Sequence, residues 1–94
     1  MGRRRKIAKE VLPEERERFY RELQDGRLSL AETSRRMREL LDLDQAEYAK
    51  LIKISARTLI DLETEKGNPT LQTLEKLGKP FGLKLVYKPV KQAD

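Results

Sequence analysis

The sequence contains no cysteine, no histidine and no tryptophan. Without cysteine the chain can form no disulfide, zinc ribbon or thiol nucleophile, and without histidine it lacks the commonest general base and transition-metal ligand. No apolar run approaches the roughly 20 residues of a membrane span, and no apolar signal-peptide region follows the basic start. We therefore expect a cytoplasmic, non-enzymatic protein with no metal, no other cofactor and no membrane partner.

Charged residues are abundant, at 39% of the chain, and basic ones predominate. The 21 Lys and Arg residues outnumber the 16 Asp and Glu residues, which gives a formal net charge of +5. This balance favours a polyanionic partner, most often nucleic acid, although many basic domains bind none. A chain of 94 residues forms one domain with a thin core, so dimerisation would add stability.

The two ends lack apolar periodicity. Residues 1–12 form a basic flexible arm that includes Arg3, Arg4 and Arg5, and residues 90–94 form a tail. The arm either follows DNA phosphates or enters a minor groove, or it is only a solubilising tail. Residues 13–26 contain an N-terminal helix that begins at Pro13, and this helix either packs across the domain or dimer or contacts a protein partner.

Four more helices are predicted within residues 27–82. Ser29 with Glu32, and Asp44 with Glu47, have the spacing of a capping box, and Ser55 is a cap for the helix after it. In the first of these helices the predicted buried stripe is Leu30, Met37, Leu40 and Leu41, and the predicted solvent face is Arg35, Arg36 and Arg38. The last helix contains Leu71, Leu74 and Leu77 and should end early, at Gly78 and Pro80.

Residues 44–63 are two short helices separated by about three residues, a spacing that requires a small residue where the helices cross. Ala49 meets that requirement, and Ile54, Leu59 and Leu62 supply apolar contacts. The remaining face of the second helix presents a set that no core requires, namely Ala56, Arg57, Ile60 and Asp61. A helix-turn-helix presents such a face to the DNA major groove.

Residues 29–88 resemble the Xre/Cro family of helix-turn-helix repressors. The resemblance depends on the positions named above, on Gln45 and Glu63, and on the NPTLQTL stretch at 68–74. It implies a mostly α, five-helix, lambda-repressor-like domain. The family usually has glycine where this chain has Lys53, and a left-handed conformation there would cost roughly 1 kcal/mol. Glycine is also usual near Thr64 and Glu65.

Apolar and polar residues alternate after the helices, which predicts one β-strand at 83–89. No second strand is predicted, so this strand would pair with its symmetry mate across a dimer through Leu83, Leu85, Val86 and Tyr87. The GLKLVYKP stretch at 82–89 resembles HipB-like antitoxins, in which a C-terminal strand pairs in this way.

The resemblance also implies roles for individual residues. Gln45, Ser55 and Thr58 would lie near DNA phosphates, and Lys53 and Lys66 would add positive charge beside them. Arg57 would contact guanine, Asp61 would accept a hydrogen bond from cytosine, and Ala56 or Ile60 would touch a thymine methyl group.

These observations favour a transcription repressor that binds a palindromic double-stranded DNA operator as a homodimer. Within that class we expect a bacterial antitoxin that regulates its own operon, binds a kinase-like toxin and joins the nucleoid when bound to DNA. The alternatives are a stand-alone repressor of phage or mobile-element type, and a helix-turn-helix scaffold used only for protein–protein interaction.

Overall fold

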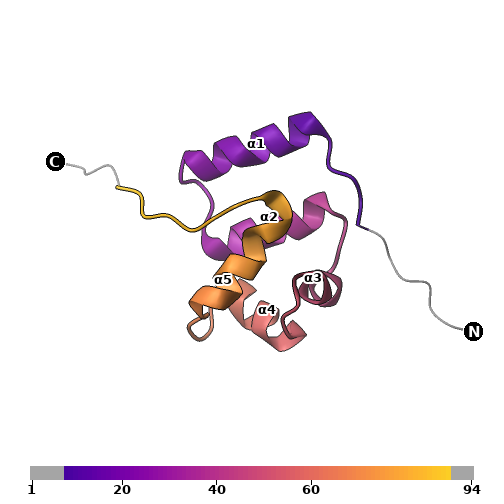
Figure 1. Ribbon diagram of the computed structural model, residues 1–94, viewed down its shortest axis with the longest axis vertical. Helices are drawn as coiled ribbons and strands as arrows, with labels where there is room; N and C mark the ends of the chain where they lie inside the picture. Colours follow the sequence, from indigo (N-terminus) through magenta and orange to yellow (C-terminus); the bar gives the residue numbers. More distant parts are fainter. Residues whose placement is uncertain (1–7, 90–94) are drawn as a thin grey trace, which may run out of the picture.

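The computed structural model describes residues 8–89. In this range the chain forms five α-helices and one short 3-10 helix. These elements are α1 (Pro13–Gln24), α2 (Leu30–Leu40), α3 (Gln45–Ile52), α4 (Ala56–Glu63), α5 (Leu71–Gly78) and the 3-10 helix η1 (Lys79–Phe81). In Figure 1, α1 lies on one side of α2, and α3 and α4 lie on the other. The prediction of a mostly helical domain with five helices is confirmed.

Capping hydrogen bonds fix the predicted helix starts. Ser29 Oγ accepts from the Glu32 N–H (3.1 Å), and the Glu32 carboxylate accepts from the Ser29 N–H (2.9 Å). Asp44 and Glu47 form the same reciprocal pair at the start of α3, and Ser55 caps α4. Each cap satisfies a backbone donor that the helix itself leaves free, worth about 1 kcal/mol.

Left-handed residues end α3 and follow α4. Lys53 has φ 65° and ψ 47°, which confirms the conformation predicted for it. This geometry lets the Ile54 N–H donate to the Ala49 carbonyl (3.0 Å) and so closes the helix end. The Lys76 ammonium donates to the Lys53 carbonyl (3.3 Å). Glu65, with φ 61°, is left-handed in the loop after α4. A side chain in this conformation is strained by roughly 1 kcal/mol relative to glycine.

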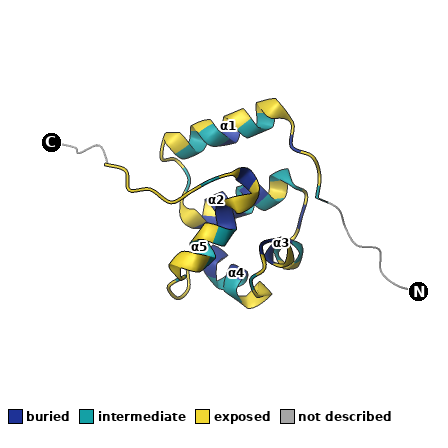
Figure 2. Cartoon of the chain, viewed as in Figure 1, coloured by how far each residue is buried: buried dark blue, intermediate teal, exposed yellow. Residues whose placement is uncertain are grey.

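The core surrounds Tyr48, whose side chain is fully buried. Its hydroxyl donates to the Leu77 carbonyl (2.6 Å), so the phenol gains a partner inside the protein. Burial raises the pKa of Tyr48. The other buried apolar residues are Val11, Phe19, Ala31, Met37, Leu43, Ala49, Ile52, Leu59, Leu62, Leu77 and Phe81. Buried residues, dark blue in Figure 2, occur in every helix, and Val11 and Leu43 lie in the connecting segments.

Two predictions about α2 are wrong. Leu30 was expected in the buried stripe, but it is the first residue of the helix, beyond the edge of the core, and is 42% exposed. The arginine face was expected in solvent, but its side chains are half-buried and bond to groups of α1 and α4. Arg36 forms an ion pair with Glu22 of α1, and the Arg35 guanidinium donates to the Glu63 carbonyl (2.9 Å).

The strand predicted at 83–89 is not formed in the single chain. Strand hydrogen bonds need a neighbouring strand about 4.8 Å away, and residues 8–89 contain no strand to serve as that neighbour. The segment begins with the Leu83 N–H donating to the Gly78 carbonyl (3.0 Å), and the Leu83 side chain packs against Gly78. The chain then leaves the helical body. The apolar residues of this part are exposed to solvent, namely Leu85, Val86 and Tyr87.

We expect Lys53→Gly and Glu65→Gly each to raise the free energy of unfolding by roughly 1 kcal/mol, because glycine adopts the left-handed conformation without strain. Urea denaturation measures the effect. Lys50→Gly is the matched control, since it removes an exposed lysine from inside α3 and should destabilise by about 1 kcal/mol. A loss of stability in both left-handed variants would show that these side chains contribute more than the strain costs.

Candidate nucleic-acid interface

The predicted helix-turn-helix corresponds to α3, the turn after it and α4, which pack directly against each other. Ala49 of α3 is buried, as are Leu59 and Leu62 of α4. Ile54 in the turn is half-buried and packs against the same core. Since Leu59 and Leu62 fix which side of α4 faces inward, the opposite side is available to a partner.

The outward side of α4 is polar. The side chain of Arg57 is 78% exposed, that of Asp61 is 41% exposed, and Arg57 Nη1 lies 3.9 Å from Asp61 Oδ1. An exposed pair one helical turn apart contributes only about 0.3–0.5 kcal/mol, so it does little to hold Arg57 against its own helix. Ala56 is exposed, and Ile60 is half-buried beside these residues.

Polar groups also flank both ends of α4. Ser55 Oγ accepts from the Thr58 N–H (3.0 Å) and lies 2.7 Å from Thr58 Oγ1. Lys53 in the turn and Lys66 in the following loop are exposed. The outward face of α4 is therefore bordered by hydroxyl groups and lysines.

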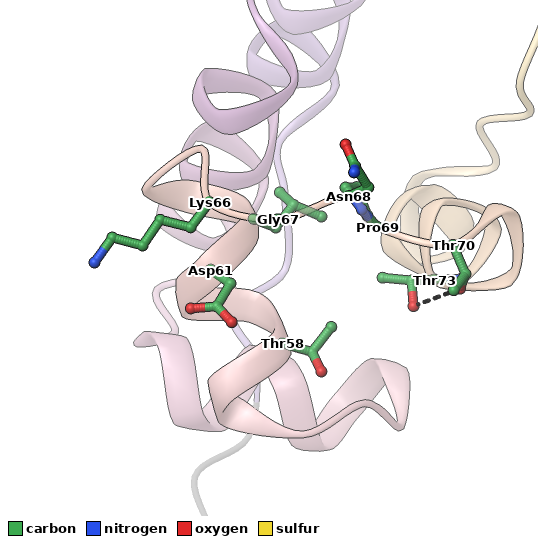
Figure 3. A pocket seen from close by; sticks show the side chains of 9 residues that line it. Thr58, Asp61, Lys66, Gly67, Asn68, Pro69, Thr70 and Thr73 are labelled. Carbon is green, nitrogen blue, oxygen red and sulfur yellow. Dashed lines mark hydrogen bonds between the residues drawn. The ribbon is translucent and has the colours of Figure 1, made fainter.

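A cleft of about 250 Å³ lies between α4 and the start of α5 (Figure 3). Thr58, Asp61 and Lys66 line its α4 side, whereas Thr70 and Thr73 line its α5 side. The two threonine hydroxyl oxygens lie 3.0 Å apart, and the Lys66 side chain extends away from them. The cleft continues the polar surface of α4 towards α5.

One predicted contact residue, Gln45, lies off that face. Gln45 is half-buried, and its amide donates to Glu63 Oε1 (3.0 Å). An amide nitrogen carries two N–H groups, so this bond leaves one for another acceptor. The predicted arm residues Arg3, Arg4 and Arg5 lie outside the described residues 8–89.

Glu63, at the end of α4, is the centre of a buried polar cluster that the sequence analysis missed. Its side chain is only 1% exposed. Arg38 of α2 binds it with two nitrogens, at 2.8 Å for Nη2 to Oε1 and 2.9 Å for Nε to Oε2. Ser34 Oγ donates to Oε2 (2.5 Å), and Gln45 of α3 completes the set. The prediction that Arg38 faces solvent is therefore wrong.

The cluster keeps Glu63 ionised. Burial opposes its ionisation, but hydrogen bonds from Arg38, Ser34 and Gln45 outweigh burial and hold the pKa of Glu63 below its ordinary value of 4.5. The hydrogen bonding between Arg38 and Glu63 also raises the pKa of Arg38. Removing one partner of such a buried pair costs about 3–5 kcal/mol, because the other charge is left unpaired. Glu63 thus fixes how α4 sits against α2 and α3.

A signal for this cluster was present in the sequence. Glu63 follows Leu62 directly and lies one turn after Leu59, so it belongs to the inward side of α4. A carboxylate in that position needs an internal partner. The identity of the partner depends on how α2 packs on α4, which periodicity within one helix does not reveal.

Among residues 8–89, no helix is long and apolar enough to cross a membrane. In the same range, no three acidic side chains form a group able to hold a metal ion.

We expect Glu63→Gln to lower the free energy of unfolding by roughly 3 kcal/mol at neutral pH, because Arg38 loses its counter-charge. The folded-state pKa of Glu63 is lowered, so its stabilising contribution is present above pH 4.5 and is lost as pH falls through the folded-state pKa. The stability difference between wild type and variant should therefore shrink below pH 4.5.

Urea denaturation from neutral to acid pH tests this expectation, with the exposed Glu75→Gln variant as control. A difference that stays constant down to the acid limit would show that Glu63 is not ionised in the folded protein.

A helix-turn-helix family model of the Xre/Cro type matches residues 35–88, from within α2 through the exposed C-terminal segment. No curated protein and no solved structure matches the chain significantly. The match spans more than half of the chain and includes α3, the turn and α4, but it leaves α1 outside. The chain therefore belongs to the Xre/Cro-type helix-turn-helix family of DNA-binding transcription regulators.

Proposed function

We propose that the protein is a transcription repressor that binds a palindromic operator as a homodimer, each copy placing α4 in a major groove. The single observation that supports this most is the outward face of α4, where Arg57 is 78% exposed although the helix is anchored behind by buried Leu59, Leu62 and Glu63. A B-DNA major groove is wide enough to admit such a helix.

Three kinds of base contact fit this face. Arg57 has the reach and the paired donors to bind O6 and N7 of guanine, a contact worth about 1–3 kcal/mol of discrimination. Asp61, one turn further along, accepts from the amino group of cytosine. The methyl groups of Ala56 and Ile60 suit contact with a thymine methyl group.

Phosphate contacts would come from the border of the same face. Ser55 and Thr58 present hydroxyl groups at the start of α4, where helix N–H groups favour an anion. Lys53 and Lys66 are exposed beside them, and the second N–H of Gln45 is suited to a phosphate oxygen. The arm that contains Arg3, Arg4 and Arg5 would add further neutralised phosphates, each raising the salt slope by about 0.9.

The homodimer is proposed to form through residues 83–89. Leu85 is 46% exposed, Val86 is 68% exposed and Tyr87 is fully exposed, so the segment presents apolar side chains with little cover from its own chain. Pairing with the same segment of a second copy, together with partly buried Leu83, would satisfy the backbone and cover these groups. The two-fold axis of that pair would match the symmetry of a palindromic operator.

The similarity of residues 82–89 to HipB-like antitoxins supports a more specific role within this function, that of an antitoxin that regulates its own operon. Its partner would be a kinase-like toxin. Co-purification with a kinase-like protein encoded beside the chain supports this role, whereas the absence of such a neighbour favours a stand-alone repressor of phage or mobile-element type.

We expect Arg57→Ala to lose roughly tenfold or more of the preference for the operator over random duplex, because the contact to guanine is removed. Binding is measured at two salt concentrations on a duplex enriched from a randomised pool. Arg21→Ala is the matched control, because it removes an exposed arginine from α1, on the far side of the molecule from α4 (Figure 1).

Equal, weak binding of wild type and Arg57→Ala to every duplex would contradict the proposal. That outcome would favour the alternative in which the helix-turn-helix serves only as a scaffold for protein–protein interaction.

We expect Val86→Pro to be monomeric in sedimentation at concentrations where wild type is dimeric, since proline removes a ladder donor and fixes φ. Operator affinity should fall with dimerisation while the helical content stays unchanged. Val86→Thr keeps a β-branched side chain and the backbone N–H, and should remain dimeric. A dimeric Val86→Pro variant would show that another surface joins the two copies.

A further inference from the structure

Helix α1 lies outside the matched residues 35–88, yet it contacts η1 at the end of the domain. Its buried residue Phe19 packs edge-on against Phe81 of η1, with the ring centroids 5.3 Å apart. Phe81 is 2% exposed and is followed directly by Gly82 and the segment 83–89. Helix α1 therefore contacts Phe81, which lies just before the exposed segment 83–89.

Polar contacts add to the packing of Phe19 against Phe81 and fix the orientation of the backbone there. The Tyr20 hydroxyl donates to the Phe81 carbonyl (2.7 Å), and the Arg16 guanidinium donates to the Tyr20 hydroxyl oxygen (3.3 Å). The Arg16 guanidinium carbon also lies 5.3 Å from the centre of the Phe81 ring. Hydrogen bonds and ring contacts together restrain the peptide plane at Phe81, not only its side chain.

The segment contacts the helices at two further points. At its start, Leu83 packs so closely on Gly78 that an added Cβ there would lie 2.9 Å from the Leu83 Cβ. Near its end, the Lys88 ammonium donates to the Gln24 carbonyl at the end of α1. Figure 1 shows the segment leaving the helices on the side where α1 ends. Helix α1 thus contacts the chain both immediately before the segment and near its far end.

We propose that α1 sets the direction in which residues 83–89 leave the domain, and thereby fixes the operator half-site spacing that the dimer accepts. Arg16, Phe19 and Tyr20 are positioning residues in this arrangement, because they act through Phe81 and not by touching DNA. The inference rests on the proposed homodimer that pairs through 83–89 and binds a two-fold operator.

In B-DNA the spacing between two half-sites sets both their distance and their relative rotation. Inserting one base pair between half-sites separates them by about 3.4 Å and rotates one against the other by roughly 35°. A dimer whose α4 helices are held at a fixed distance and angle binds one spacing well and its neighbours poorly. A dimer joined by loose segments adapts to several spacings at a small cost. The rigidity of the connection at Phe81 decides between these two behaviours.

The double variant Arg16→Ala/Tyr20→Phe tests the inference, because it removes the polar anchor while Phe19 stays in the core. Arg18→Ala is the control, since it removes an exposed arginine from the same helix. Affinity is measured for the operator and for derivatives with one base pair added or removed between half-sites. We expect the double variant to remain folded and dimeric while its preference for the best spacing falls at least about fivefold, with the control unchanged.

A second measurement does not depend on DNA. Because the chain has no cysteine, Lys50→Cys places a single spin label on each copy. The distribution of distances between the two labels should be narrow in the wild-type background and in Arg18→Ala, and broad in Arg16→Ala/Tyr20→Phe.

The possible results distinguish a failure of this inference from a failure of the proposed repressor function. An unchanged spacing preference or an unchanged distance distribution in a dimeric double variant would overturn the inference and leave the repressor intact. A wild-type protein that is monomeric, or that binds one half-site as tightly as two, would overturn both. A weaker affinity that is equal at every spacing would also overturn the inference, because it is what a purely structural α1 predicts.

Discussion

The carboxylate of Glu63 joins three helices at one buried point, and the orientation of α4 depends on it. Arg38 and Ser34 reach it from α2, and Gln45 reaches it from α3. Both α3 and α4 are only eight residues long, and isolated helices of that length are not stable in water. The outward face of α4 is therefore held in place by tertiary contacts, with this ion pair at one end and the buried leucines along its length.

The features predicted correctly from sequence are those determined by residues a few positions apart. The caps at Ser29, Asp44 and Ser55 each bond a group three residues away, so spacing alone identifies them. The left-handed conformation of Lys53 is implied by the resemblance to the Xre/Cro family, which usually has glycine at this position. By contrast, Arg38 and Glu63 are 25 positions apart, and their contact is decided by how α2 crosses α4, which no local pattern contains.

In the candidate site, too, the features set by nearby residues could be predicted and those set by packing between elements could not. The outward face of α4 could be deduced because Leu59 and Leu62 define its opposite side. The position of Gln45 could not be deduced in this way, because its half-buried amide donates a hydrogen bond to Glu63 on another helix. The segment 83–89 shows a further limit, since alternation of residues indicates which side chains suit a strand but a strand forms only beside a partner. The anchoring of that segment by α1 is likewise a property of packing between opposite ends of the chain.

The three tyrosines occupy three different environments, which makes them internal optical reporters. Tyr48 is enclosed in the core, Tyr20 bonds the carbonyl at the joint between α1 and η1, and Tyr87 is fully exposed on the C-terminal segment. The chain has no tryptophan to dominate its emission. Variants that retain one tyrosine at a time would let fluorescence follow core melting, helix detachment and chain pairing as separate events, without an attached dye.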